Sequence, residues 1–326
     1  MIDGKPRYRN LNALLQGFFG EKVQKVSLSA GFTCPNRDGT RGRGGCTFCN
    51  PASWEALGLV KGSSIPRQIR EGIEYVRERH KVGKFLAYFN DYTNTYDGVE
   101  RLERIYRQAL DEPEVVGLVV STRPDCLPPD VLDLLERLSR ETFLWVEVGI
   151  QTAHDSTLER VNRCHTVEDS RRAIEALLRR HVAVSVHVIL GLPGESAGDM
   201  FETARSVTES GVYGVKIHNL HIVKDTILSA QYRKGEVQLL ELEEYVDVVV
   251  GFLERLPPHL VIQRMTAQSP RRLTIAPEWS VNKWVVVNAI HRALETRDTW
   301  QGKALGGLRE ELERPLELPA LRICAR

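Results

Sequence analysis

The chain has 326 residues, of which 42% are hydrophobic and 27% are charged, and its formal net charge is +1. That length allows one large α/β domain with an appendage, or two modest domains, and either can bury a full core. The near-neutral charge excludes a global field that would attract the protein to DNA or a membrane, and neither a signal-peptide core nor about 18 consecutive apolar residues occur, so we expect a cytoplasmic location without membrane association.

The first predicted strand leads directly into an irregular loop. Apolar side chains alternate with polar ones at Val26, Leu28 and Ala30, which is the period of a strand. The loop that follows, GFTCPNRDGTRGRGGCTFCNP, is crowded with Gly, Pro, Asn and Asp. A helix is then predicted at residues 66–79, with Ser64 as its cap.

From this point buried strands alternate with amphipathic helices. Apolar runs predict strands at residues 85–89, 115–120, 143–148, 183–190 and 215–217, and helices are predicted at 99–110, 129–138, 167–180 and 199–209. This alternation indicates βαβ units and a parallel sheet. With the first strand the chain has six β/α units, fewer than a closed eight-stranded barrel needs. We therefore predict an α/β fold, a partial (β/α)6 TIM-like barrel.

After Lys224 the pattern changes to a helix at 239–256, a short strand at 261–264 and a helix at 281–296. We interpret residues 1–225 as the barrel core with an N-terminal segment. Residues 226–326 are interpreted as a C-terminal α/β extension packed on the barrel.

The cysteines indicate a metal site. They are Cys34, Cys46, Cys49, Cys126, Cys164 and Cys324. The first three follow the spacing C-x11-C-x2-C, whereas the other three stand alone and are interpreted as structural. Because cytoplasmic thiols stay reduced, a metal site explains the triplet better than disulfides do.

Three thiolates without a local fourth ligand are suited to an iron–sulfur cluster. No histidine lies between Met1 and Arg79, so a zinc site would need a distant histidine, an alternative that stays open. A [4Fe-4S] cluster held by three cysteines leaves one iron open for the amino and carboxylate groups of S-adenosylmethionine (SAM). One electron then cleaves SAM to a 5′-deoxyadenosyl radical.

Several segments resemble one family in the same order. They are KVSLSAGFTCPNRDGTRGRGGCTFCNP, YFNDYTNTY, STRPD, WVEVGIQTAHDSTLERVNRCHT, HVILGLPGES and VKIHNLHIVK. Together they resemble the YhcC/YtqA-type radical SAM proteins and, more distantly, the radical SAM part of the Elongator catalytic subunit and the oxygen-independent coproporphyrinogen oxidases. The resemblance implies a radical SAM enzyme with a [4Fe-4S] cluster on Cys34, Cys46 and Cys49.

The resemblance also implies cofactor-binding residues, which are Phe48, Asn90, Thr93, Asn94, Arg123, Glu147, Gln151 and His187. Phe48 is expected near the adenine or in loop packing. The polar residues from Asn90 to Asn94 follow the second strand, where the family contacts the SAM amino group. Arg123 is expected at the SAM carboxylate, at a substrate phosphate or in a structural turn.

Glu147 lies inside an otherwise apolar strand and needs a partner, which is SAM, a residue holding it, or an ion pair with Arg163. Gln151 is expected at the ribose. His187 is expected either to point into the barrel or to be a satisfied core histidine.

The substrate implied by the Elongator-like resemblance is tRNA, with modification of the wobble uridine, and a donor such as flavodoxin or ferredoxin would supply electrons. His218 and His221, near Lys216 and Lys224, are candidates for substrate contact. A basic N-terminal region interleaved with Tyr8, Phe18 and Phe19 would suit a single-stranded RNA loop. The alternatives are a small-molecule or peptide substrate, and a non-catalytic, zinc-stabilised RNA-binding protein.

Overall fold

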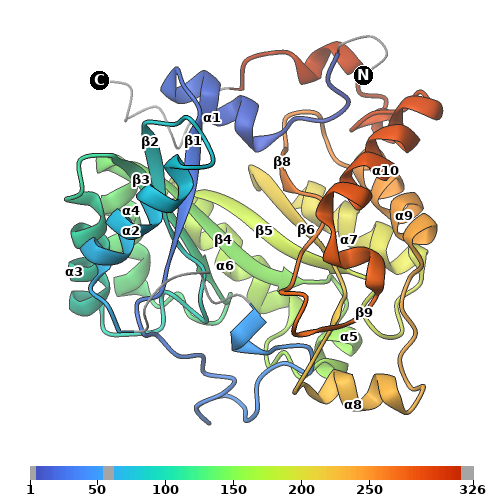
Figure 1. Ribbon diagram of the computed structural model, residues 1–326, viewed down its shortest axis with the longest axis horizontal. Coiled ribbons are helices and arrows are strands. Elements are labelled where there is room, and N and C mark those ends of the chain that lie inside the picture. Colours follow the sequence, from blue (N-terminus) through green and yellow to red (C-terminus); the bar gives the residue numbers. More distant parts are fainter. Residues whose placement is uncertain (1–4, 54–61, 317–326) are drawn as a thin grey trace.

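The fold is built on one parallel sheet that curls into an open barrel. The computed structural model describes residues 5–53 and 62–316. Seven strands pair in the order β1-β2-β3-β4-β5-β6-β8, all of them parallel. Helices cover the outer face of this sheet (Figure 1). The predicted α/β partial barrel is therefore confirmed.

The elements follow one another regularly along the chain. The strands of the sheet are β1 (Val23–Leu28), β2 (Lys84–Phe89), β3 (Val115–Thr122), β4 (Phe143–Gln151), β5 (Ala183–Leu190), β6 (Gly214–Asn219) and β8 (Val261–Arg264). The α-helices are α1 (Leu11–Phe19), α2 (Ile65–Arg77), α3 (Val99–Leu110), α4 (Pro129–Glu141), α5 (Asp155–Arg160), α6 (Val167–Arg179), α7 (Ala197–Glu209), α8 (Ile227–Arg233), α9 (Leu242–Glu254) and α10 (Lys283–Thr296). A separate antiparallel pair consists of β7 (Ile222–Val223) and β9 (Thr274–Ala276).

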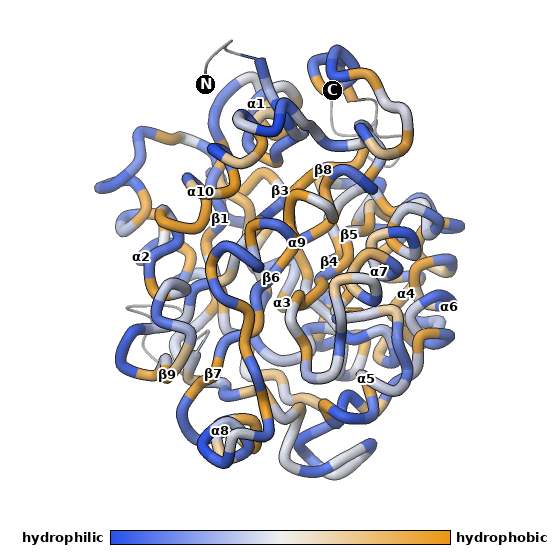
Figure 2. Tube along the Cα trace, turned by 90° about the vertical axis from the view of Figure 1, so that its right-hand side faces the viewer, coloured by the Kyte–Doolittle hydropathy of each residue, from blue (hydrophilic) through white to orange (hydrophobic). Residues whose placement is uncertain are grey.

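Local sequence explains where the covering helices begin. Thr166 and Asp169 form a reciprocal capping box at the start of α6, and Ser196 and Asp199 do the same for α7. The apolar faces of the helices pack on the outer side of the strands in one continuous core. Figure 2 shows the hydrophobic residues concentrated along the central strands.

Helix α1 closes one end of the barrel. Leu15 of α1 is buried against a cluster that includes Leu86, Val119 and Trp145 from inside the sheet. Because this floor is apolar and packed, the open space of the barrel lies at the opposite end, where the strands end and the connecting loops begin (Figure 1).

The C-terminal region contributes to the sheet itself. Strand β8, predicted as part of an extension, pairs with β6 as a seventh strand. The amide of Ile262 in β8 donates to the carbonyl of Arg9 at 2.7 Å, so the N-terminal segment lies along the edge of this strand. A sheet built from the six predicted units alone would therefore be one strand short.

The remaining differences from the prediction concern element ends and short elements. Strand β1 begins three residues earlier than Val26 and ends before Ala30. Helices α1, α5 and α8 and the β7–β9 pair were not predicted. No helix in the described ranges has the length and apolar character that crossing a membrane requires.

Candidate active site

A cavity of about 640 Å³ opens at the carboxyl ends of the strands. The cysteine loop after β1 forms one part of its wall, with Cys34, Cys46 and Cys49. The other walls come from the ends of β2 to β6, from β8 and from residues 267–271. The site is therefore assembled from both the barrel core and the C-terminal region.

Backbone turns fold the cysteine loop back on itself. The Cys49 amide donates to the Cys46 carbonyl at 3.0 Å, and the Arg37 amide donates to the Cys34 carbonyl at 2.8 Å. Gly45 has a φ of +83°, and a Cβ there would lie 2.6 Å from Nη1 of Arg37. Glycine at this position thus allows the arginine to cross the loop.

The sulfur spacing does not suit a single zinc ion. Among the described residues, no group of three potential ligands that includes these cysteines has all of its ligand atoms within 4.8 Å of one another. Four ligands at about 2.3 Å from one tetrahedral zinc would place sulfurs about 3.8 Å apart. At least one pair of these sulfurs is therefore farther apart than two ligands of one zinc ion are.

Nitrogen donors surround two of the three sulfurs. Cys46 Sγ accepts from Arg163 Nη1 at 3.4 Å and from Asn36 Nδ2 at 3.5 Å, and Cys49 Sγ accepts from Arg37 Nη1 at 3.4 Å. Burial, followed by the neighbouring Cys46, raises the pKa of the Cys49 thiol to about 12, against the opposing effect of Arg37. A bound metal replaces that proton, and the donors then stabilise the thiolates.

Unpartnered polar atoms line the rest of the cavity. The cavity wall includes four buried atoms that have no hydrogen-bond partner within residues 5–53 and 62–316: Asn90 Oδ1, Thr93 Oγ1, Gln151 Oε1 and His187 Nε2. Buried polar atoms without partners are costly, so a wall of them fits a polar ligand. A ligand with amino and hydroxyl donors would supply such partners.

Gln151 holds an unusual backbone conformation at this wall. Its φ is +73°, and the pairing of β4 with β5 is irregular between Val148 and Gln151. This conformation is unfavourable for a residue with a Cβ, and strain of this kind is concentrated at functional sites. The bulge lies where β4 reaches the cavity.

Arg123 is fixed by a buried ion pair. Its Nε and Nη2 donate to the two carboxylate oxygens of Asp125 at 2.8 and 2.9 Å, and both side chains are 2% exposed. Nη2 also donates to the carbonyl of Arg163 at 2.8 Å. Nη1 alone is left without a partner, and the residue lines the cavity.

Glu147 anchors an ion cluster inside the barrel. Lys25 Nζ and Lys216 Nζ each lie 2.8 Å from one of its carboxylate oxygens, and Tyr88 and Ser121 donate to Oε2 at 2.7 and 3.0 Å. Burial opposes ionisation, but Lys216 and Lys25 hold the pKa of Glu147 well below its usual range. The suggested ion pair with Arg163 is wrong, because that guanidinium donates to the carbonyl of Gly149 and to Cys46.

Beyond the ion cluster, the wall carries two imidazole rings in contact, tilted at 52° to one another. The rings of His187 on β5 and His218 on β6 have centroids 3.8 Å apart, and Arg264 Nη1 lies 3.0 Å from His218 Nε2. Burial, and then the nearby cations, hold the pKa values of both histidines well below the usual range. Both imidazoles are therefore neutral near pH 7.

Most residues singled out from the sequence meet at this cavity. The lining includes Cys34, Cys46, Phe48, Cys49, Asn90, Thr93, Arg123, Glu147, Gln151, His187, Lys216, His218 and His221. Phe48 also packs against an apolar cluster that contains Ile189 and Leu220. Asn94 lies behind the wall, where its Nδ2 donates to the Ser121 carbonyl at 2.9 Å, and Lys224 is not part of the wall. Cys126 and Cys164 are outside the lining, and Cys324 lies outside the described residues.

The N-terminal aromatic residues do not form a surface for RNA. Phe18 and Phe19 pack with centroids 5.5 and 5.3 Å from that of Phe143, and the Tyr8 hydroxyl lies 3.0 Å from His291 Nε2. Lys25 points to the ion cluster instead of solvent. That interpretation is wrong because these side chains complete the barrel floor and its contacts with α10.

Sequence reasoning missed several wall residues, among them Arg37, Tyr88, Ser121 and Arg264. One usable signal was present. Lys25, Tyr88, Ser121 and Lys216 are polar positions within predicted or neighbouring strands, and polar side chains inside buried strands need partners. The donors on the cysteine loop gave no comparable signal.

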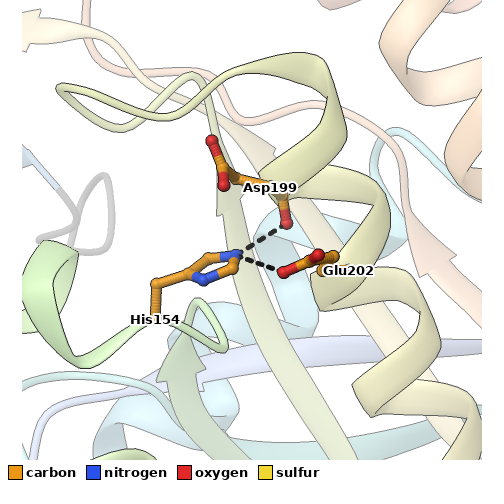
Figure 3. Close-up of side chains that lie close together, drawn as sticks. All are labelled: His154, Asp199 and Glu202. Carbon is orange, nitrogen blue, oxygen red and sulfur yellow. Dashed lines mark hydrogen bonds and ion pairs between the residues drawn. The ribbon is translucent and has the colours of Figure 1, made fainter.

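A second group of potential ligands lies outside the cavity. His154, Asp199 and Glu202 gather where α7 begins, with His154 Nε2 2.9 Å from the Asp199 carbonyl and 4.0 Å from the Glu202 carboxylate (Figure 3). The Asp199 carboxylate itself accepts from Ser196 in the capping box. The group is thus accounted for by the start of α7.

Family models match most of the chain. The Radical SAM superfamily matches residues 34–207, and the Radical_SAM C-terminal domain matches residues 212–296. YtqA of Bacillus subtilis (strain 168) is 42% identical over 305 residues, which cover 94% of this chain and 95% of that protein. These matches include every cavity-lining cysteine and β8.

More distant proteins share part of the sequence or the fold. The tRNA uridine(34) acetyltransferase of Methanocaldococcus jannaschii is 26% identical over 180 residues, which cover 54% of this chain and 32% of that protein. The structure of Methanocaldococcus infernus Elp3 with an N-terminal deletion matches with a TM-score of 0.66 at 18% identity, over 86% of this chain and 64% of that one. At that identity the likeness concerns the fold. The chain belongs to the radical SAM superfamily, among the YhcC/YtqA-type proteins, and is an enzyme whose cofactors are a [4Fe-4S] cluster and SAM.

Proposed function

We propose that Cys34, Cys46 and Cys49 hold three irons of the cluster and that SAM occupies the cavity between them and the strand ends. When bound, the cluster supplies the electron that cleaves SAM to methionine and a 5′-deoxyadenosyl radical, which takes a hydrogen atom from the substrate. The observation that carries this proposal is the placement of three cysteines, two of them with nitrogen donors at their sulfurs, on a wall of unpartnered polar atoms.

The chain's own groups then have distinct tasks. Arg163 and Asn36 donate to one sulfur and Arg37 to another, which favours the thiolate form. Asn90, Thr93 and Asn94 follow β2, where we place the SAM amino group, with Asn94 acting from behind the wall.

The other cofactor contacts follow from the remaining wall residues. The unpartnered Nη1 of Arg123 is assigned to the SAM carboxylate, Gln151 to the ribose and Phe48 to the adenine. Glu147 acts indirectly, because its oxygens are occupied by Lys25, Lys216, Tyr88 and Ser121. It keeps the lysines in place below the cofactor.

The substrate we propose is tRNA, with modification at a wobble uridine and an electron donor such as flavodoxin or ferredoxin. Sequence similarity to a tRNA uridine(34) acetyltransferase and fold similarity to Elp3 support this class. Two exposed aromatic side chains, one on the cavity wall and one in the first turn of α10, add physical support. Tyr92, 39% exposed, lines the cavity, and Trp284, 62% exposed, follows the lining residue Val281 by three positions. Exposed rings of this kind can stack on unpaired bases.

Metal analysis tests the cluster assignment. Anaerobically reconstituted protein should contain about four irons and four sulfides per chain. Each of the variants Cys34→Ala, Cys46→Ala and Cys49→Ala should lose most of both, whereas Cys164→Ala should not. One zinc per chain without sulfide would reject the assignment.

A binding titration tests the substrate class. Fluorescence anisotropy with labelled tRNA at several salt concentrations should give an affinity that falls as salt rises. Trp284→Ala should weaken binding by roughly tenfold, since base stacking is worth about 1–3 kcal/mol. Tyr75→Ala removes a ring of similar exposure, 43%, from α2 and should have no effect. Binding without any salt dependence, or no binding, would reject tRNA.

A further inference from the structure

The far edge of the sheet presents a cationic wall to the cavity. His187, Lys216 and Arg264 are register neighbours across β5, β6 and β8, and His218 lies two residues beyond Lys216. In sheet order β8 is the strand furthest from β1, which leads into the cysteine loop. The cavity therefore joins the cysteines to a chemically different wall.

Positive charge is in excess on the lining. The basic residues are Arg37, Arg123, Arg163, Lys216, Arg264 and Arg271, together with three histidines. Among the described lining residues the one acidic side chain is that of Glu147, which already has two lysine partners. Arg264 and Arg271 form no ion pair with a carboxylate in the parts of the chain that the structure describes, and both are exposed to the cavity mouth. An unpaired guanidinium facing a concave site is a recognition element for anions.

Contacts within this wall orient its donors. Arg264 donates from Nη1 to His218 Nε2 at 3.0 Å, which fixes one side of its guanidinium plane; its other nitrogens form no side-chain hydrogen bond with the described part of the chain. Contact with His218, at a centroid distance of 3.8 Å and an interplanar angle of 52°, holds the ring of His187, whose buried Nε2 has no partner among the residues that the structure describes. The guanidinium of Arg264 and the ring of His187 thus both contact the ring of His218.

We propose that Arg264, together with His187, forms a subsite for an anionic group of the substrate, a phosphate or a carboxylate. This inference rests on the proposed radical SAM function, and it specifies that the substrate binds at the side of the cavity formed by β5, β6 and β8. If the substrate is tRNA, the anion is a phosphate flanking a nucleotide that enters the cavity, as in enzymes that extrude their target base. If it is a small molecule, the anion is its own carboxylate or phosphate.

The test compares two charge-matched variants of cluster-loaded protein. Arg264→Gln removes the proposed contact, and Arg292→Gln removes an exposed arginine of α10 that lies outside the cavity lining. In anisotropy titrations with an anticodon stem-loop RNA, Arg264→Gln should weaken binding about tenfold. It should also reduce the slope of log affinity against log salt concentration by about one, and Arg292→Gln should change neither quantity. Equal effects of the two variants would overturn the subsite.

A second measurement separates this inference from the tRNA proposal. Isothermal titration with inorganic phosphate and with succinate needs neither RNA nor turnover. The wild type should bind at least one of these anions, and Arg264→Gln should bind it about tenfold more weakly than Arg292→Gln does. This result would support the subsite even if the RNA fails to bind, and it would then point to a small-molecule substrate. If neither anion binds the wild type, or if both variants bind it as the wild type does, the subsite is wrong.

Discussion

Arg37 donates through Nη1 to the sulfur of Cys49 at 3.4 Å and to the carbonyl of the same residue at 3.4 Å. The contact crosses the cysteine loop over Gly45, whose lack of a Cβ leaves room for the guanidinium. A cationic donor at a ligand sulfur stabilises the more negative, reduced cluster, so with the cluster on Cys49, as we propose, this contact would raise the reduction potential.

Replacing Arg37 by glutamine should therefore make the cluster harder to reduce. A differential interaction of about 1 kcal/mol between the two redox states corresponds to roughly 40 mV for one electron, and we expect a shift of that order to more negative potential. A redox titration followed by electron paramagnetic resonance measures it. Arg43→Gln removes an exposed arginine of the same loop and should leave the potential unchanged. A shift in the positive direction would show that Arg37 does not act on the sulfur.

Glu147→Gln should destabilise the fold strongly. The substitution leaves Lys25 and Lys216 without their carboxylate inside the barrel, and breaking a buried ion pair costs about 3–5 kcal/mol. Urea unfolding of the metal-free protein at pH 7 measures the change. The matched control is Glu209→Gln, whose carboxylate is 70% exposed and 3.9 Å from Arg205, and it should cost at most about 0.5 kcal/mol. Similar losses for both variants would show that the ion cluster around Glu147 does not contribute to the free energy of unfolding.

The same carboxylate should make stability depend on pH in the acid range. The folded pKa of Glu147 is depressed, so its contribution is complete above the unfolded value of about 4.3 and is lost as pH falls through the folded value. The groups facing it are the ammonium groups of Lys25 and Lys216 and the Tyr88 hydroxyl. The difference in urea midpoint between the wild type and Glu147→Gln should narrow between about pH 5 and pH 3. A difference that stays constant over that range would contradict the depressed pKa.

The variant Gln151→Gly distinguishes a role of this side chain in SAM binding from a role in the stability of the fold. Glycine relieves the cost of φ +73°, so stability should be unchanged or higher by up to about 1 kcal/mol. Loss of the side chain should weaken SAM binding to cluster-loaded protein by about tenfold in equilibrium dialysis. Unchanged SAM affinity would remove Gln151 from the cofactor site.

The sequence was sufficient for the repeating part of the fold. Fully buried runs such as 143–148 and 183–190 alternate with helices whose apolar spacing and capping residues are local features. Helix α3 was predicted with its observed ends, Val99 and Leu110. The sequence also predicted that the cysteine triplet and the polar residues after β2 and β3 belong to one site, because strand ends of a parallel sheet meet at one edge.

Features that depend on residues distant in the chain could not be predicted from the sequence. The partners of Glu147 are separated from it by 122 and 69 positions, so the positions of Lys25 and Lys216 within strands do not show which carboxylate they face. Strand β8 has only four residues, and its pairing with β6 depends on how the C-terminal helices pack. Phe18 and Phe19 looked available for stacking because the sequence does not show that α1 closes the barrel.

The central claim is that three cysteines leave one iron free for SAM, and product formation tests it most directly. Reconstituted wild-type protein should convert SAM to 5′-deoxyadenosine when dithionite is added, as measured by liquid chromatography and mass spectrometry. Cys34→Ala, Cys46→Ala and Cys49→Ala should each fall to background, and Cys164→Ala should retain the activity. A fully loaded wild type that forms no 5′-deoxyadenosine, or a variant of the triplet that still forms it, would contradict the account.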